Sequence, residues 1–284
     1  MNSTRVAALQ MISGSDVAGN LQVAEALIAD AARHGAKLLV LPEAFACYDS
    51  EQSTALGVAE RHPGGPLRSF LAVQARRHRV YLVGGTIPIA GADALPRAAC
   101  LLYGDDGSEL ARYDKIHLFD VDLPDAQRSY RESAFYTHGA EVVSAMTPLG
   151  LLGLAVCYDL RFPELFRVLF QRGADVLALP SAFTHMTGEA HWHVLLRARA
   201  IENQAFVIAS AQGGRHSAQR ETWGGSVIID PWGRVLASAA SGAQFISADL
   251  DPGMLAELRA RLPVRSHQRI YVPDPGADDS SSKR

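Results

Sequence analysis

Apolar residues along the chain follow two alternating patterns, one typical of buried strands and the other of amphipathic helices. The short apolar runs Val6–Met11 and Lys37–Leu41 predict strands that are covered on both faces. Between them, apolar residues recur every three or four positions up to Arg33, which predicts a helix with Asn20 as its N-cap. Gly35 lies just beyond the expected end of this helix. This alternation of strand and helix is typical of α/β proteins.

The strand and helix pattern occurs in two series, and each series contains a hairpin at a comparable place. The first series continues with a helix at Pro66–Arg77, a strand at Val80–Gly84 and a hairpin of Ala98–Tyr103 with Glu109–Tyr113. The second series comprises strands at Leu151–Cys157, Ala174–Leu179 and Ala205–Ser210, helices at Pro163–Arg172 and His191–Gln204, and a hairpin of Ser226–Asp230 with Arg234–Ser238. Two such series predict two layers of strands packed face to face, with helices outside.

The remaining segments predict a loop, a closing strand and helix, and a polar tail. Residues 118–139 are polar and predict a loop, whereas Phe245–Leu250 and Gly253–Arg261 predict a strand and a helix. No low-complexity insert or linker divides the chain, so we expect one domain over residues 1–272 and a polar tail over 273–284. A chain of 284 residues is long enough to bury a sizeable core.

Composition and charge exclude several classes of protein. With 48% hydrophobic and 20% charged residues, the chain is too apolar to be disordered. The net charge of -3 and the lack of a basic stripe disfavour nucleic-acid binding. We find neither the apolar core of a signal peptide nor a run of about 20 apolar residues, so we expect no membrane contact. Three cysteines without a CxxC motif favour a reducing compartment, and we therefore expect a cytoplasmic protein.

Three residues that could carry chemistry follow predicted strands. Glu43 occurs in LPEAF, Lys115 in RYDKIH and Cys157 in GLAVCYDLRFPE. Loops at the carboxyl ends of strands are where open α/β sheets place their ligands. An isolated Glu or Lys there is more often a solvated surface charge, and a buried Cys is more often inert. The polar YDLR segment after the cysteine favours a wet, charged pocket in which a thiolate can exist.

Together these side chains form a set that suits cleavage of an amide. A thiolate attacks the carbonyl carbon, and a carboxylate takes the thiol proton and later activates water. An ammonium group stabilises the oxyanion, with help from a backbone N–H. Residue spacing alone does not show that the three groups meet, so their convergence is an expectation for the structure to test.

The motifs LPEAF, RYDKIHLFD and GLAVCYDLRFPELFR, in that order, resemble the signatures of the nitrilase superfamily of carbon–nitrogen hydrolases. The resemblance extends to about Tyr271 and implies a catalytic triad of Glu43, Lys115 and Cys157. It also implies a second active-site glutamate between the Lys and the Cys. Glu132 in Arg131-Glu132-Ser133 matches that position and is expected to orient Lys115 and the substrate. The family fold is an α/β four-layer α-β-β-α sandwich that dimerises across one helical face, so a homodimer is expected.

Later segments resemble the amidase branch of this family. AQGGRH and IIDPWG are most like the deaminated glutathione amidases, which remove a side product of transaminases acting on glutathione. The implied reaction is hydrolysis of a carboxylate-bearing amide to 2-oxoglutarate and cysteinylglycine. The alternative is an ω-amidase acting on 2-oxoglutaramate or 2-oxosuccinamate, although that branch usually lacks the QGGRH-type loop. TWGGS departs from the family, which more often has His before the Ser, and this bears on substrate preference rather than on the triad.

Further residues are expected to contact the substrate. The backbone N–H of Tyr158 would stabilise the oxyanion beside Lys115. Arg215 and His216 follow a predicted strand in a Gly-rich loop and are candidates for binding a carboxylate, as is the backbone at Phe183–Thr184. An exposed, solvated Arg215 is an equally good interpretation.

Other functions were weighed against this one. His191 and His193 lie two apart on a predicted helix and face different sides, so we expect no metal. No P-loop or GxGxxG motif is present, and we expect no cofactor. A non-catalytic relative that only binds partners is disfavoured by the intact Glu, Lys and Cys. An acyltransferase, in which an amine replaces water, shares the thioester stage and stays an alternative.

Overall fold

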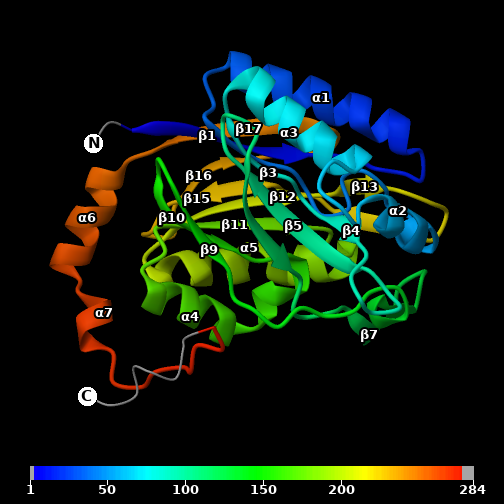
Figure 1. Cartoon of the computed structure of the whole chain (residues 1–284). Coiled ribbons are helices and arrows are strands. Elements are labelled where there is room, and N and C mark those ends of the chain that lie inside the picture. Colours follow the sequence, from blue (N-terminus) through cyan, green and yellow to red (C-terminus); the bar gives the residue numbers. More distant parts are fainter. Residues whose placement is uncertain (1–2, 277–284) are drawn as a thin grey trace.

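The computed structural model describes residues 3–276, and two β-sheets form its centre (Figure 1). In strand order, the first sheet comprises β17 (Gln244–Leu250), β1 (Thr4–Gln10), β2 (Leu38–Val40), β3 (Tyr81–Val83), β5 (Arg97–Tyr103) and β4 (Ile87–Ile89), with β6 (Glu109–Asp114) paired to β5. The second sheet comprises β16 (Val235–Ser238), β15 (Val227–Ile229), β12 (Phe206–Ala211), β11 (Val176–Ser181), β10 (Gly150–Leu154) and β9 (Ser144–Thr147).

The two sheets repeat one arrangement. In each, three parallel strands are followed by an antiparallel hairpin: β1, β2 and β3 precede β5–β6, and β10, β11 and β12 precede β15–β16. This confirms the two series and the two hairpins that the sequence predicts. The closing strand β17 leaves the second half of the chain and pairs antiparallel with β1, so it ties the two halves together.

Helices cover the outer face of each sheet (Figure 1). α1 (Val17–Arg33) and α3 (Pro66–His78) pack on the first sheet, and α4 (Pro163–Arg172) and α5 (His185–Asn203) pack on the second. The resulting order of layers is α-β-β-α, which confirms the predicted fold class. The other elements are η1 (Ser50–Gln52), α2 (Ser53–Ala59), β7 (Asp120–Asp122), β8 (Ser129–Arg131), η2 (Glu132–Ala134), η3 (Cys157–Arg161), β13 (Gly213–Arg215), β14 (Glu221–Trp223), α6 (Pro252–Arg261) and α7 (Val264–His267).

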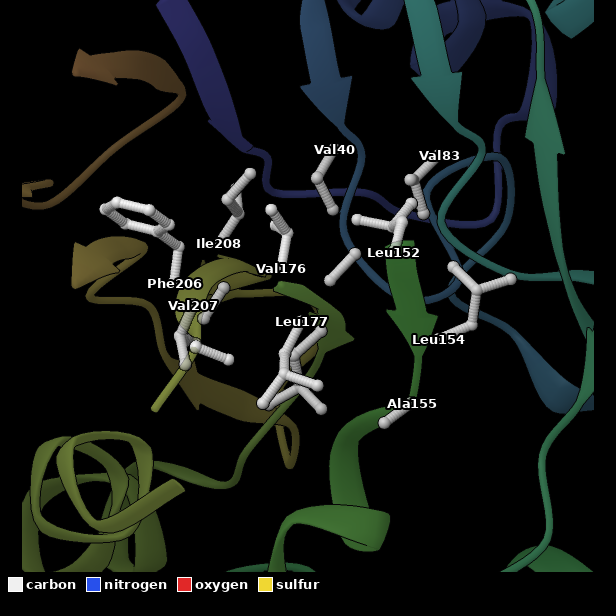
Figure 2. Packing of buried hydrophobic residues seen from close by; sticks show 14 of the residues in the cluster. Val40, Val83, Leu152, Leu154, Ala155, Val176, Leu177, Phe206, Val207 and Ile208 are labelled. Carbon is white, nitrogen blue, oxygen red and sulfur yellow. The ribbon is translucent and has the colours of Figure 1, made fainter. Parts of the chain in front are cut away.

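The central strands need continuous runs of apolar residues because their side chains point alternately to two buried faces. Successive strand residues point to opposite faces, and both faces of each central sheet are covered. Val40 and Val83 of the first sheet point toward Leu152 and Val176 of the second, as Figure 2 shows. Alternate residues of the first sheet, such as Leu39, instead pack under α1 and α3.

Two predicted helix starts are wrong. α1 begins at Val17 after Asp16. Asn20, the predicted cap, is buried, and its side chain donates to the carbonyls of Gly14 and Ala46 at 2.9 Å each. α5 begins at His185 rather than at His191, because the hydroxyl of Thr184 caps it.

Two other boundaries also differ from the sequence prediction. The strand predicted to end at Cys157 stops at Leu154 in β10, and the cysteine begins the helical turn η3. The predicted loop 118–139 contains the small antiparallel sheet β7–β8 and the turn η2. Neither the β7–β8 sheet nor η2 has an apolar run long enough to be recognised from the sequence.

The chain after α7 packs back against α4. Arg172 donates two hydrogen bonds of 2.6 Å to the carboxylate of Asp274. Most of the predicted polar tail, residues 277–284, lies outside the described residues. Among residues 3–276, no helix is both long and apolar enough to cross a membrane.

Candidate active site

Four side chains predicted to be catalytic line one cavity of about 500 Å³. Glu43 follows β2, Lys115 follows β6, Glu132 begins η2 and Cys157 begins η3. These residues are far apart in the sequence, and the two-sheet architecture brings the loops that carry them to the same end of the strands. The volume is in the range of binding sites for small organic ligands.

An ammonium group held between two carboxylates occupies the floor of this cavity. Nζ of Lys115 donates to Oε1 of Glu43 at 2.7 Å and to both carboxylate oxygens of Glu132 at 2.8 and 2.9 Å. Oε2 of Glu132 also accepts a bond of 2.7 Å from the backbone N–H of Phe119. The lysine side chain is only 2% exposed, so its charge is satisfied by these two carboxylates.

The pKa shifts in this cluster follow from burial and from neighbouring charge. Burial lowers the pKa of Lys115, but the carboxylates of Glu132 and Glu43 outweigh it and leave that pKa well above its ordinary value. Burial raises the pKa of Glu132, and the ammonium of Lys115 opposes this rise. The lysine therefore keeps its positive charge at neutral pH, as a group that stabilises an oxyanion must.

Cys157 occupies a tight turn that presents its sulfur to the cavity. Its φ of 48° lies in the left-handed region, which a non-glycine residue adopts at a cost. The backbone N–H of Ala182 donates to Sγ at 3.5 Å. Burial raises the pKa of the thiol well above its ordinary value, and the Glu43 carboxylate raises it further, against Lys115. The raised pKa favours the neutral thiol of Cys157.

Asp159 joins the segment that carries Lys115 to the turn that carries Cys157. Its fully buried carboxylate accepts bonds of 2.7 Å from the hydroxyl of Tyr113 and from the N–H of Val156. The other oxygen accepts from the backbone N–H and from Nδ1 of His117, at 3.1 and 2.7 Å. The YDLR segment is therefore divided, because Tyr158 and Arg161 line the cavity whereas Asp159 is an internal brace.

The loop that carries Glu43 is fixed by residues that sequence reasoning missed. The fully buried Nε2 of Gln212 donates to the backbone carbonyl of Glu43 at 3.0 Å. The backbone N–H of Ala44, at a φ of 52°, donates to the hydroxyl of Thr86 at 2.8 Å. Gly85 has a φ of 58°, and a Cβ there would collide with the carbonyl of Pro42. Gln212 belongs to the AQGGRH segment, but nothing in that segment indicates its partner.

The residues predicted to bind substrate do not all reach the cavity. Tyr158, Phe183, Thr184 and His216 line it. The N–H of Tyr158 lies in the first turn of η3, where amides have no partner within the helical segment. Arg215 is outside the lining, exposed, and 3.5 Å from the carboxylate of Glu221.

His216 and Thr184 use their polar atoms within the protein. Nδ1 of His216 donates to the carbonyl of Ser13, and its Nε2 accepts from the hydroxyl of Thr222, both at 2.7 Å. Burial lowers the pKa of this histidine, which favours the neutral ring. The hydroxyl of Thr184 accepts the N-cap bond from the N–H of Thr187. Both side chains shape the wall of the cavity and offer it no charge.

Two arginines that the sequence analysis did not select face the cavity instead. Arg161, on η3, lies over the ring of Phe183 at 5.1 Å. Arg220, just before β14, lies over the ring of Tyr130 at 4.6 Å. Within residues 3–276, neither guanidinium forms an ion pair with a carboxylate. Arg161 belongs to the YDLR motif, whereas no pattern in the sequence singles out Arg220.

A metal site was not found in this region. Across residues 3–276, no group of three or more His, Cys, Asp or Glu side chains is arranged to hold a metal ion. His191 contacts Nη1 of Arg161 at 3.2 Å, and the indole of the neighbouring Trp192 donates to the carbonyl of Gly225 at 2.7 Å.

The chain belongs to the carbon–nitrogen hydrolase family, whose model matches residues 5–260. The chain is 44% identical over 275 residues to a deaminated glutathione amidase of Synechocystis, covering 94% of this chain and 98% of the relative. It is 37% identical over 271 residues to mouse omega-amidase NIT2, covering 95% and 96%. The crystal structure of Saccharomyces cerevisiae Nit3, of the nitrilase superfamily, matches with a TM-score of 0.85 at 31% identity, covering 95% and 97%.

Proposed function

We propose that this protein is an amidase that hydrolyses deaminated glutathione to 2-oxoglutarate and cysteinylglycine. The observation that carries the proposal is the Glu43–Lys115–Glu132 cluster, which shares one cavity with the thiol of Cys157. The 44% identity to a relative named deaminated glutathione amidase supports the substrate. The two cavity arginines without carboxylate partners add to this support, because the proposed substrate carries two carboxylates.

Acylation is the first half of the proposed reaction. Glu43 takes the proton of Cys157, and the resulting thiolate attacks the carbonyl carbon of the scissile amide. Nζ of Lys115 and the N–H of Tyr158 stabilise the oxyanion, while Glu132 holds the lysine in place. The tetrahedral intermediate then collapses. Glu43 gives the proton to the leaving nitrogen, cysteinylglycine departs, and the acyl group stays on sulfur as a thioester.

Deacylation uses the same groups in reverse roles. Glu43 removes a proton from water, and the hydroxide attacks the thioester carbonyl. The second tetrahedral intermediate uses the same oxyanion contacts. Its collapse breaks the carbon–sulfur bond and releases 2-oxoglutarate, and the proton on Glu43 returns to the sulfur. The raised pKa of Cys157 supports this cycle, in which the sulfur begins and ends as a protonated thiol.

The remaining candidate residues take smaller roles in this proposal. Phe183, Thr184 and the neutral His216 form part of the cavity wall. Because Arg215 is exposed and outside the cavity lining, the proposal gives the carboxylate-binding role to Arg161 and Arg220 instead.

The test compares two substrates in the same assay, following release of the 2-oxo acid. We expect kcat/KM to be higher for deaminated glutathione than for 2-oxoglutaramate. A clear preference for 2-oxoglutaramate would instead support the ω-amidase alternative. The 37% identity to mouse omega-amidase NIT2 is the observation in favour of that alternative. Release of an acyl-amine in place of the free acid, when an amine acceptor is added, would point to the acyltransferase alternative.

A matched pair of cysteine variants tests the nucleophile. Cys157→Ala is expected to abolish turnover and to leave the fold intact. Cys100→Ala is the control, because Cys100 is buried in β5 and does not line the cavity. Substantial amidase activity in the Cys157 variant, measured beside an active Cys100 variant, would refute the thioester mechanism.

We also propose a homodimer built on the α5 face of the second sheet. Val194 and Ile201 lie seven residues apart on α5 and are exposed, and the exposed Trp232 lies in the adjacent β15–β16 turn. Exposed apolar side chains gathered in this way often mark an interface. The mass from light scattering tests it: Val194→Glu is expected to give monomer, and an unchanged mass would exclude this face.

The cytoplasm as location is likewise a proposal. Cys47, Cys100 and Cys157 are all free, and the proposed nucleophile works only as a reduced thiol. Cell fractionation with a tagged chain tests this location.

A further inference from the structure

Aromatic side chains are concentrated in the wall of the catalytic cavity. Seven of the 28 residues that line it are Phe or Tyr, whereas aromatic residues make up 7% of the whole chain. Rings of this kind stabilise a ligand by burying its apolar parts and by stacking on them. The carboxylates and the amide of the proposed substrate need charged and hydrogen-bonding partners instead. The proposed substrate therefore does not account for the aromatic wall.

Five of the seven rings already have partners within the protein. Four of them lie 4.6–5.9 Å from a guanidinium carbon, Tyr48 and Tyr130 at Arg220, and Tyr158 and Phe183 at Arg161. The fifth, Phe119, meets the rings of Tyr130 and Tyr158 edge to face, with centroids 5.2 and 5.0 Å apart. These rings hold the two arginines of the cavity in place, which explains their presence there.

Phe135 and Tyr136, the other two rings, have no such partner. Among residues 3–276, neither ring stacks on another aromatic side chain or on a guanidinium, and the hydroxyl of Tyr136 forms no hydrogen bond. Both side chains are half-buried, and both line the cavity. Part of each side chain is therefore available to a bound molecule.

Backbone hydrogen bonds fix the segment of these two rings beside the groups of the proposed reaction. The N–H groups of Phe135 and Tyr136 each donate to the carbonyl of Glu132 at 3.0 Å. Further along, the N–H of Gly139 donates to the carbonyl of Lys115 at 2.8 Å. The two rings thus belong to the turn that begins with Glu132, and that turn is tied to the segment that carries Lys115.

The surroundings of Tyr136 indicate which part of an amide these rings meet. Burial raises the pKa of Tyr136, and the negative charges of Glu132 and Glu43 raise it further, so the phenol stays protonated and lies near both carboxylates. In the proposed mechanism Glu43 gives a proton to the leaving nitrogen, and a group that does so must be within hydrogen-bond reach of that nitrogen. A substituent on the nitrogen therefore lies on the side of the scissile bond that Glu43 and Tyr136 share.

We propose that Phe135 and Tyr136 form an aromatic subsite for the group on the amide nitrogen, and that the enzyme also hydrolyses amides whose nitrogen carries an aromatic group. This inference rests on the proposed function and adds a class of leaving amine, while the acyl group stays that of a 2-oxo dicarboxylic acid. The cavity of about 500 Å³ has room for such a group, since roughly 150 Å³ of apolar cavity holds a benzene ring.

The chemical steps are those of the proposed reaction. The sulfur of Cys157 forms a bond to the carbonyl carbon, and the thiol proton passes through Glu43 to the nitrogen as the carbon–nitrogen bond breaks. The aromatic amine departs as the neutral product. Water then takes the acyl group from sulfur and releases the 2-oxo acid.

The experiment compares the N-benzyl and N-methyl amides of 2-oxoglutarate, which differ only in the group on nitrogen. Both release a primary alkyl amine, so the scissile bond is closely matched. With the unmodified enzyme, kcat/KM is expected to be about 10-fold higher for the N-benzyl amide, mostly through KM, because its ring meets two aromatic side chains. Phe135→Ala is expected to remove most of this preference. Equal kcat/KM values in the unmodified enzyme, or a preference that Phe135→Ala leaves unchanged, would overturn the inference.

Further variants separate a subsite from a structural role. Tyr136→Ala is expected to reduce the preference for the N-benzyl amide and Tyr136→Phe to retain it, because the ring is needed and the hydroxyl is not. Phe135→Leu keeps an apolar side chain of similar size and tests the same point if the alanine variant does not fold. Tyr271→Ala, at an exposed ring outside the cavity lining, is the control and is expected to change neither rate. An equal loss on both amides in Phe135→Ala and Phe135→Leu would show that Phe135 supports the Glu132 turn, and the inference would fail.

Deaminated glutathione, assayed beside the two amides, separates failure of this inference from failure of the proposed function. If the unmodified enzyme hydrolyses it but does not prefer the N-benzyl amide, only the inference fails. If it hydrolyses none of the three compounds, the proposed function fails. Calorimetric titration of the N-benzyl amide into Cys157→Ala then tests the subsite without turnover. Affinity that is unaffected by adding Phe135→Ala overturns the inference, and absence of binding overturns it as well.

Discussion

Replacing Asp159 by asparagine tests the internal brace between Lys115 and Cys157. The carboxylate accepts four hydrogen bonds, two on each oxygen, and it is fully buried. An asparagine keeps the shape but has one oxygen and one NH2 group. If the NH2 faces His117, that residue's backbone N–H loses its acceptor. If the NH2 faces Val156, the N–H of Val156 loses it.

The expected cost follows from this count of acceptors. A buried N–H without an acceptor costs about 1–3 kcal/mol, and the bonds that remain are weaker because the acceptor is neutral. We therefore expect Asp159→Asn to lower the free energy of unfolding by about 3 kcal/mol. That loss corresponds to a fall in Tm of roughly 6 °C for a chain of this size. Tyr113→Phe removes one of the four donors and also the hydroxyl that accepts from the N–H of Ile116 at 3.3 Å, so it should cost about 2 kcal/mol.

Urea unfolding at neutral pH, followed by circular dichroism at a fixed protein concentration, measures both variants. The Asp159 variant should also lose turnover, because the same carboxylate positions the turn that carries Cys157. An Asp159→Asn protein as stable as the unmodified one, to within about 0.5 kcal/mol, would refute the reasoning, because that is the range of neutral surface substitutions. The reasoning would also be refuted if Tyr113→Phe lowered the free energy of unfolding by more than Asp159→Asn.

Three further predictions concern the loops around the cavity. Glu132→Gln should lower kcat by about 100-fold. It should also move the alkaline limb of the kcat/KM profile to lower pH. The reason is that the Glu132 carboxylate is the main charge that raises the pKa of Lys115, whereas burial lowers that pKa. Glu43→Gln should cost at least about 100-fold in turnover. The thiolate absorbance of Cys157 at 240 nm should also appear at lower pH, because a charge that raises its pKa is removed. Gly85→Ala should destabilise by more than the roughly 1–2 kcal/mol of a left-handed alanine, because its Cβ meets the loop before Glu43.

Matched controls give each of these predictions a way to fail. Gly35 also has a positive φ, but a Cβ there meets open space. Gly35→Ala should therefore cost only the free energy of placing alanine in the left-handed region. Equal losses of stability in Gly85→Ala and Gly35→Ala would exclude the collision with Pro42. A thiolate that titrates at the same pH after Glu43→Gln would show that the carboxylate does not act on the sulfur. An unmoved alkaline limb after Glu132→Gln would separate Glu132 from the charge of Lys115.

Much of the fold was predictable because its strands are covered on both faces and therefore read as continuous apolar runs. β2, β11 and β12 were found within one or two residues for this reason. The boundaries that failed depend on single polar contacts. Asn20 looks like a cap and instead donates to the carbonyls of Gly14 and Ala46, and the cap of α5 is Thr184, seven residues before the expected start at His191. Local pattern does not encode such partners.

The residues of the candidate site were also predictable only in part. Glu43, Lys115 and Cys157 were selected because each follows a predicted strand, and Glu132 was selected because of the family resemblance. Arg220 was missed and Arg215 selected, although both belong to one hairpin. Their difference is a matter of direction: one guanidinium points into the cavity beside Tyr48, and the other points to solvent beside Glu221.

The amino-acid sequence by itself determined the two-series α/β architecture and the residue types available for amide chemistry, because hydrophobic periodicity and strand-end motifs are local properties of the chain. Only the tertiary structure decided that a lysine would lie between two carboxylates, that the sulfur of Cys157 would be buried beside them, and that two arginines would face the cavity without carboxylate partners. Charge, burial and hydrogen bonding depend on distances between residues that are remote in sequence, and those distances exist only once the two sheets have packed.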